Sequence, residues 1–119
     1  GVITKFIKRI ADEKPLEIFG DGLQTRDFVA IYDVIDAIHN ASLYDKRGIF
    51  NIASGKVITI KELAEQMISL SEKILEMQFV AVKKGDIKHS QADISIAKNQ
   101  LGYSPKLELK EMIKELLNE

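Results

Sequence analysis

Two short stretches of this 119-residue chain carry the side chains best suited to bind an anionic ligand: "IFGDGLQTRDFV" at 18–29 and "KKGD" at 83–86. The first contains Arg26 beside Asp27, at the start of a predicted strand. An arginine presents a planar fork of N–H donors that stays charged, and this suits phosphate oxygens. Without further context, Arg26 could equally form a surface ion pair with Asp27 or Asp33, and 83–86 could be an ordinary solvated turn.

The adjacent Arg26 and Asp27 are expected to serve different purposes. Side chains alternate between the two faces of a strand, so the two residues point in opposite directions. We expect Arg26 to reach a ligand. Asp27 should be structural, either bonding nearby backbone or capping the helix that follows.

The sequence contains no self-contained catalytic constellation. There is no cysteine, and His39 and His89 are fifty residues apart, so a metal site is not expected. "GDG" is too short for a dinucleotide-binding loop and precedes a strand. None of the three tyrosines has a lysine four residues on. These patterns favour a binding module, or part of a larger enzyme, over a complete enzyme.

Composition restricts the class of protein further. With 17 basic and 18 acidic residues, the formal net charge is −1, and no basic face typical of nucleic-acid binders is apparent. No apolar run approaches the roughly 20 residues that span a bilayer, and no signal peptide is recognisable. We therefore predict a cytoplasmic protein without nucleic-acid or membrane partners. Because the chain starts without Met, we expect a processed product or a fragment.

Helical and strand patterns alternate along the chain, which predicts an α/β fold in one domain, 1–119. Thr59 and Glu62 have the spacing of a capping box, and Asp93 is the predicted N-cap of a short helix. The predicted helices are 2–13, 32–44, 60–70, 94–101 and 109–117, and the predicted strands are 16–19, 26–31, 49–52 and 77–82.

Three motifs, in this order and at this spacing, carry a family resemblance: "PLEIFGDGLQTRDFVAIYDVIDAI", "GIFNIASGKVITIKELA" and "KKGDIKHSQADISIAKNQLGYSPKLELKEMI". Together they resemble the C-terminal, substrate-binding part of the extended short-chain dehydrogenase/reductases. The branch they resemble is that of the NAD-dependent sugar-nucleotide epimerases and dehydratases, of the UDP-glucose 4-epimerase type. The resemblance implies that an N-terminal Rossmann domain, which binds NAD and carries the catalytic Tyr-x-x-x-Lys, is absent from this stretch. These 119 residues alone would then bind no cofactor and be inactive.

The resemblance also assigns residues to the nucleotide base. It implies that Phe19 packs near the base and that Glu17 and Ile18 offer backbone groups to its edge. Ile60, directly after the capping Thr59, would lie against the nucleotide, although a core position is equally compatible with an isoleucine there.

A second group of residues is assigned to the diphosphate and ribose. Arg26 matches the arginine that holds the diphosphate, and Lys83, in preference to Lys84, would be the second cation. Lysine supplies a point charge rather than a fork. Asp86 would accept hydrogen bonds from the ribose hydroxyls, whereas His89 is expected to be structural or peripheral.

The leading prediction is therefore the nucleotide-sugar-binding half of a UDP-glucose/UDP-galactose 4-epimerase. A dTDP-glucose 4,6-dehydratase, a uronate epimerase and a free-standing, non-enzymatic nucleotide-binding module are the alternatives. Expected partners are a UDP-sugar, the protein's own Rossmann domain and, in the whole enzyme, a second copy. Loss of the Rossmann face should expose apolar surface, so we also expect self-association or a mobile 83–92 segment.

Overall fold

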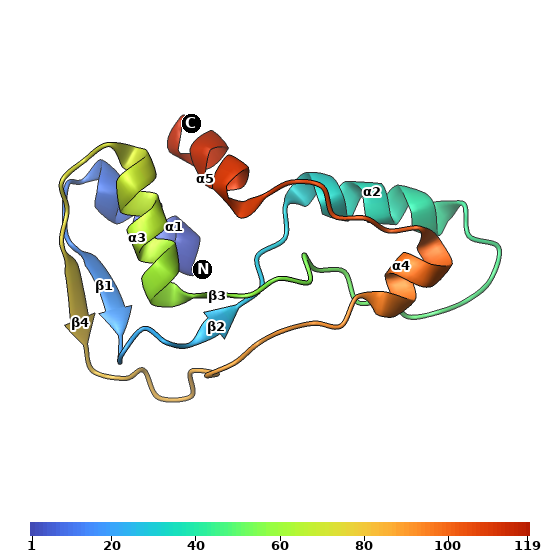
Figure 1. Cartoon of the computed structure of the whole chain (residues 1–119), viewed down its shortest axis with the longest axis horizontal. Coiled ribbons are helices and arrows are strands. Elements are labelled where there is room, and N and C mark those ends of the chain that lie inside the picture. The colour runs from blue at the N-terminus through green and yellow to red at the C-terminus, as the bar shows by residue number, and fades with distance from the viewer.

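Two groups of elements lie at opposite ends of a flat, elongated molecule (Figure 1). The computed structural model describes all residues, 1–119, in five helices and four short strands. The molecule measures 50 × 32 × 16 Å, and its radius of gyration is 16.3 Å. A compact domain of this length would have a radius of gyration of about 13.5 Å. The extended shape leaves only 19 of the 119 residues buried.

The larger group, which we call the sheet cluster, contains α1 (Val2–Ala11), β1 (Leu16–Phe19), α3 (Ile60–Ser71), β4 (Met77–Val80) and α5 (Leu109–Leu117). β1 and β4 pair in parallel, and the helices cover one side of this pair. Its buried core consists of Phe6, Ile10, Leu16, Ile18, Ile60, Leu63, Ala64, Met67 and Ile113.

The smaller group, which we call the helix cluster, contains α2 (Ile31–Ser42) and α4 (Ser95–Leu101). Its buried residues are Ala37, Ala53, Ile94, Ala97, Leu101 and Tyr103. The Tyr44 and Phe50 rings pack edge to face at its margin, with centroids 5.6 Å apart. No helix of the structure has the length and apolar character needed to cross a membrane.

Four stretches of chain, 27–30, 54–57, 81–93 and 104–108, connect the two clusters (Figure 1). Hydrogen bonds to two aspartate side chains connect these crossings to one another. The Asp27 carboxylate accepts hydrogen bonds from Ser54 and Gly55. The buried Asp33 carboxylate accepts from the backbone N–H groups of Lys106 and Leu107, at 2.9 and 3.2 Å.

The structure confirms the α/β fold and the five helices, but it corrects three strands. The predicted strand 77–82 ends two residues earlier, at Val80 of β4. Residues 49–52 form no strand, because no other strand lies beside them to complete a ladder. Ile49 is 94% exposed. The predicted strand 26–31 shortens to β2 (Thr25–Arg26), which pairs antiparallel with β3 (Ile58–Thr59). It ends there because Asp27 bonds to the 54–55 turn and α2 begins at Ile31.

Of the two helix starts predicted from capping residues, one is confirmed and one is wrong. The capping box is confirmed, since Thr59 Oγ1 accepts from the Glu62 N–H and Glu62 accepts from the Thr59 N–H, at 3.1 and 3.2 Å. Asp93 is not the N-cap of α4. It lies one residue too early and accepts a hydrogen bond from the Ser95 N–H at 2.9 Å. This bond holds the pKa of Asp93 below its usual value.

Candidate binding site

A cavity of about 780 Å³ lies in the sheet cluster, beside α1, β1, β2 and the 83–86 segment. Ile18, whose backbone the family resemblance assigned to the base, is buried in the core and does not line the cavity. The cavity brings together the other six residues that the resemblance assigned to a nucleotide site: Glu17, Phe19, Arg26, Ile60, Lys83 and Asp86. They come from parts of the chain that are up to 69 residues apart. Their proximity is a finding of the structure, whereas their individual roles stay predictions.

The alternation of β1 positions two of these residues. Leu16 and Ile18 are completely buried in the core of the sheet cluster. Because side chains on a strand alternate, Glu17 and Phe19 emerge on the opposite face, where they line the cavity. A shift of one residue in this strand would exchange the two pairs.

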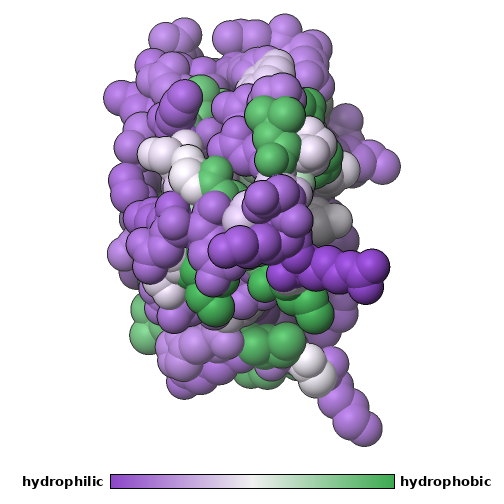
Figure 2. Space-filling view, turned by 90° about the vertical axis from the view of Figure 1, so that its right-hand side faces the viewer, coloured by the Kyte–Doolittle hydropathy of each residue, from purple (hydrophilic) through white to green (hydrophobic).

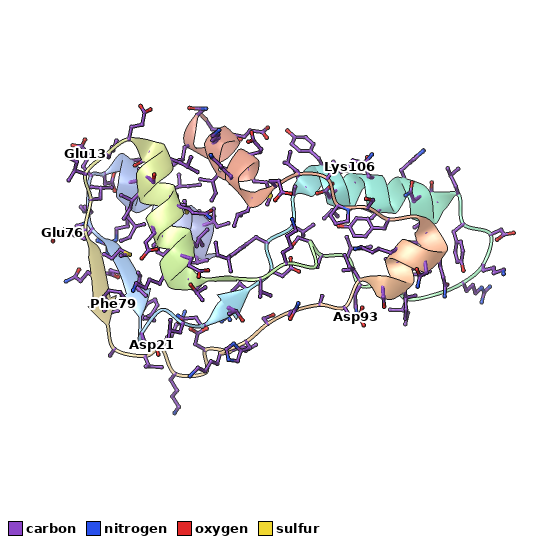
Figure 3. The ribbon with its side chains drawn as sticks, viewed as in Figure 1. Glu13, Asp21, Glu76, Phe79, Asp93 and Lys106 are labelled. Atoms are coloured by element: carbon purple, nitrogen blue, oxygen red, sulfur yellow. The ribbon has the colours of Figure 1, made fainter.

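The turn after β1 sets the distance between the strand and α3. Gly20 and Gly22 both have positive φ, and Asp21 accepts a hydrogen bond from the Leu23 N–H at 2.9 Å (Figure 3). A Cβ on Gly22 would lie 2.9 Å from a methyl carbon of Ile18, so only glycine fits here. The close approach lets the Gly22 carbonyl accept from the first turn of α3, and this places Ile60 at the cavity wall.

Arg26 is held in the cavity by two contacts. One guanidinium nitrogen lies 2.7 Å from a carboxylate oxygen of Asp86, and the other donates to the Thr25 carbonyl at 2.6 Å. Both side chains of the Arg26–Asp86 pair remain about a quarter exposed. The alternative of an ion pair with Asp27 or Asp33 is wrong, because both of these carboxylates bond to backbone elsewhere. The structural role predicted for Asp27 is confirmed.

Lys83 and not Lys84 lines the cavity. The Lys83 ammonium lies over the Phe19 ring, 5.9 Å from its centroid, within the range of a cation–π contact. His89 lies outside the cavity lining, and its Nδ1 is 3.1 Å from the Thr25 hydroxyl. Because this contact helps to hold the 81–90 segment against β2, it agrees with a structural role for His89.

Sequence reasoning missed the contribution of α1 to the cavity. One face of this helix adds basic side chains, and Arg9 forms an ion pair with Glu17 at 2.6 Å. The signal was present in the helical spacing of the charged residues, which places them on one face. The lining contains six cationic residues against three carboxylates and therefore favours an anion. The cations are Lys5, Lys8, Arg9, Lys14, Arg26 and Lys83, and the carboxylates are Asp12, Glu17 and Asp86.

The described residues do not fit a dinucleotide cofactor. Such a site needs a glycine-rich turn between a parallel strand and the N-terminus of a helix. Here the turn after β1 leads into another strand, and β4 is followed by the polar 81–90 segment. No group of three or more metal-ligating side chains gathers anywhere in the molecule.

The sequence model of the GDP-mannose 4,6 dehydratase family matches residues 1–116. The chain belongs to this family. The match confirms the predicted membership of the NAD-dependent sugar-nucleotide epimerases and dehydratases, within the extended short-chain dehydrogenase/reductases.

Individual proteins and solved structures are also similar to the chain over nearly its whole length. A UDP-glucuronate 4-epimerase of Thermodesulfobacterium geofontis is 36% identical over 98% of the chain, which covers 36% of that relative. The structure of UDP-glucose 4-epimerase with UDP-glucose from Thermotoga maritima matches 99% of the chain with 31% identity and a TM-score of 0.94. The structure of UDP-glucuronic acid 4-epimerase from Bacillus cereus, in complex with UDP-glucuronic acid and NAD, matches 99% of the chain with 32% identity and a TM-score of 0.91. The chain covers 38% of each of these two structures.

Proposed function

We propose that residues 1–119 form the nucleotide-sugar-binding domain of an NAD-dependent sugar-nucleotide epimerase of the UDP-glucose 4-epimerase type. The observation that carries this proposal is the convergence of an aromatic ring, two cations and a carboxylate on one cavity with an excess of positive charge. These are the groups that a base, a diphosphate and a ribose require. The similarity to epimerases that bind UDP-sugars supports the same assignment.

In this proposal each part of the nucleotide has its own contact. The base lies against Phe19 and Ile60, at the end of the cavity that Glu17 lines. The diphosphate lies between Arg26 and Lys83, whose ammonium exchanges its contact with the Phe19 ring for a phosphate oxygen. The Asp86 carboxylate accepts from the ribose hydroxyls. The nucleotide is thereby anchored by groups far from the reacting sugar, and such remote binding energy can serve the chemical step.

The chemistry itself belongs to the rest of the proposed enzyme. Since the described residues do not form a dinucleotide site, NAD and the catalytic Tyr-x-x-x-Lys are assigned to a Rossmann domain outside 1–119. The whole enzyme is proposed to work as a homodimer. The contribution of these 119 residues is to bind and orient the nucleotide-sugar.

A second candidate is a uronate 4-epimerase. It is favoured by the 36% identity to a UDP-glucuronate 4-epimerase and by the similarity to the Bacillus cereus structure. A 4,6-dehydratase is the third candidate, because the matching family is described as a dehydratase family. All three would use the proposed diphosphate site, and they differ in the base, the sugar or the reaction.

Calorimetric titration of the chain with UDP, dTDP and GDP tests the proposal. We expect one nucleoside diphosphate to bind most tightly. Arg26→Ala should weaken that binding about 10- to 100-fold, because it removes charge-assisted hydrogen bonds worth roughly 1.5–3 kcal/mol. Arg47→Ala is the matched control, since this exposed arginine lies outside the cavity lining. Equal losses in both variants, or affinity that is unchanged by Arg26→Ala, would contradict a phosphate role for Arg26.

A further inference from the structure

Asp86 is the only cavity carboxylate that neutralises Arg26. Its Oδ1 lies 2.7 Å from the guanidinium, and the amide of the buried Gln24 lies 3.5 Å from its other oxygen. The other two cavity carboxylates are elsewhere: Glu17 pairs with Arg9, and Asp12 takes part in no ion pair. The group best suited to bind phosphate therefore already has an anionic partner.

The position of Asp86 is fixed by the backbone around it. A turn bonds the Asp86 N–H to the Lys83 carbonyl at 3.1 Å, and Gly85 supplies the positive φ that the turn requires. Further along, the backbone of Thr25 donates to Lys88 and accepts from Ser90. The carboxylate is thus held beside Arg26 by the segment, while all residues of 81–90 remain exposed to solvent.

A fixed carboxylate at this place treats two kinds of anion differently. Inorganic phosphate and diphosphate offer mainly acceptor oxygens, so they must compete with Asp86 for Arg26 and are repelled by its charge. A ribonucleotide offers, beside its phosphates, two ribose hydroxyls that can donate to the same carboxylate. The ribonucleotide can therefore bind both Arg26 and Asp86. The inorganic anion can bind Arg26, but it is repelled by the Asp86 carboxylate.

We propose that Asp86 makes the cavity selective for nucleotides over free phosphate and diphosphate, an inference that rests on the proposed function. Arg26 supplies the attraction that both anions share, and Asp86 supplies the repulsion that only the nucleotide compensates. Discrimination of this kind needs an unfavourable contact with the wrong ligand as well as a favourable contact with the right one.

The test compares inorganic pyrophosphate with UDP by calorimetry at one low ionic strength. Asp86→Asn removes the charge and keeps the shape of the side chain. We expect it to tighten pyrophosphate binding about tenfold and to lower the ratio of the pyrophosphate to the UDP dissociation constant by at least that factor. Asp12→Asn is the matched control, because it removes one charge from the same cavity without touching Arg26. Asp86→Glu, which keeps the charge, should retain most of the selectivity.

Each outcome decides the proposal. If Asp86→Asn and Asp12→Asn change pyrophosphate affinity equally, only the net charge of the cavity matters and the inference is wrong. It is also overturned if the Asp86→Asn chain, shown to be folded by its amide NMR spectrum, binds no pyrophosphate. Failure of the wild-type chain to bind UDP would count against the proposed function. The pyrophosphate comparison would still decide the part played by Asp86.

Discussion

At the scale of single residues, the neighbouring Arg26 and Asp27 have unrelated partners. Arg26 faces the cavity and pairs with Asp86, whereas Asp27 binds the turn at 54–55 from the other side of the chain. The alternation of side chains in extended backbone was enough to predict this separation. The pairing of Arg26 with Asp86 could not be predicted, because sixty residues separate them and no local pattern relates the two positions.

Asp27 should contribute strongly to stability. Its carboxylate accepts from the Ser54 N–H at 2.9 Å, from the Ser54 hydroxyl at 2.6 Å and from the Gly55 N–H at 2.8 Å. Asp27→Ala leaves the N–H groups of Ser54 and Gly55 without a partner in a half-buried place, so we expect the free energy of unfolding to fall by about 2–4 kcal/mol. Urea denaturation measures the change.

The control for Asp27 is Asp36→Ala. Asp36 is exposed on α2 and takes part in no ion pair. Its removal should change the free energy of unfolding by less than about 0.5 kcal/mol. A similar, small effect of both substitutions would show that the 54–55 turn holds its conformation without Asp27.

At the scale of elements, signals that are complete within one turn of chain predicted one helix start correctly and another incorrectly. The capping box at Thr59 was predicted and found, whereas Asp93 lies one residue before the N-cap of α4. The strand at 49–52 was not found, because a strand is defined by its neighbour and the sequence pattern says nothing about one. The charged face of α1 was visible in the spacing, but its place beside β1 depends on packing.

Tyr103 connects the end of α4 to the 49–53 stretch and should make stability depend on pH. Its hydroxyl donates to the Ala53 carbonyl at 2.6 Å. Burial raises the pKa of Tyr103 above its ordinary value of 10.0, and the nearby Asp33 and Asp27 add to the rise. The folded state thus holds the proton more tightly than the unfolded state. This contribution is complete below pH 10 and is lost as the pH rises through the folded-state pKa.

Tyr103→Phe tests this pH dependence. At pH 7 we expect the loss of the hydrogen bond to cost about 1 kcal/mol. Between pH 8 and about 11, however, the variant should lose less stability than the wild type, because it lacks the titrating group. Tyr44→Phe, which removes a partly exposed hydroxyl from the same cluster, is the control. Parallel curves for wild type and Tyr103→Phe in urea denaturation would contradict the prediction.

At the scale of the whole molecule, three isoleucines of α2 form a stripe that is exposed to solvent. Ile31, Ile35 and Ile38 are 63%, 53% and 64% exposed and follow one another at helical spacing. Figure 2 views the α2–α4 end and shows apolar residues as separate patches among polar ones. The sequence predicted one domain, from its helix and strand pattern, and exposed apolar surface, from the Rossmann domain that the family resemblance implies is absent. It could not predict that surface's place or the division into two clusters, which follow from contacts between distant segments.

This stripe leads us to expect self-association of the 119-residue chain as its concentration rises. Sedimentation equilibrium should show a weight-average mass above 13.4 kDa, the mass of one chain. Ile35→Lys should return it toward that value. Ile74→Lys, at a fully exposed position in the loop after α3, should not. A single-chain mass at all concentrations, or equal effects of the two substitutions, would exclude association through α2.

The four crossings between the sheet cluster and the helix cluster have a consequence for how this part of the protein could arise and be divided. Neither cluster corresponds to an uninterrupted stretch of the gene, because each is assembled from segments that alternate along the chain. A single cut at any crossing would leave parts of the sheet cluster in both pieces, so no single cut separates the two clusters. End-to-end fusion of two stretches of gene that each encoded one cluster could therefore not have produced this chain.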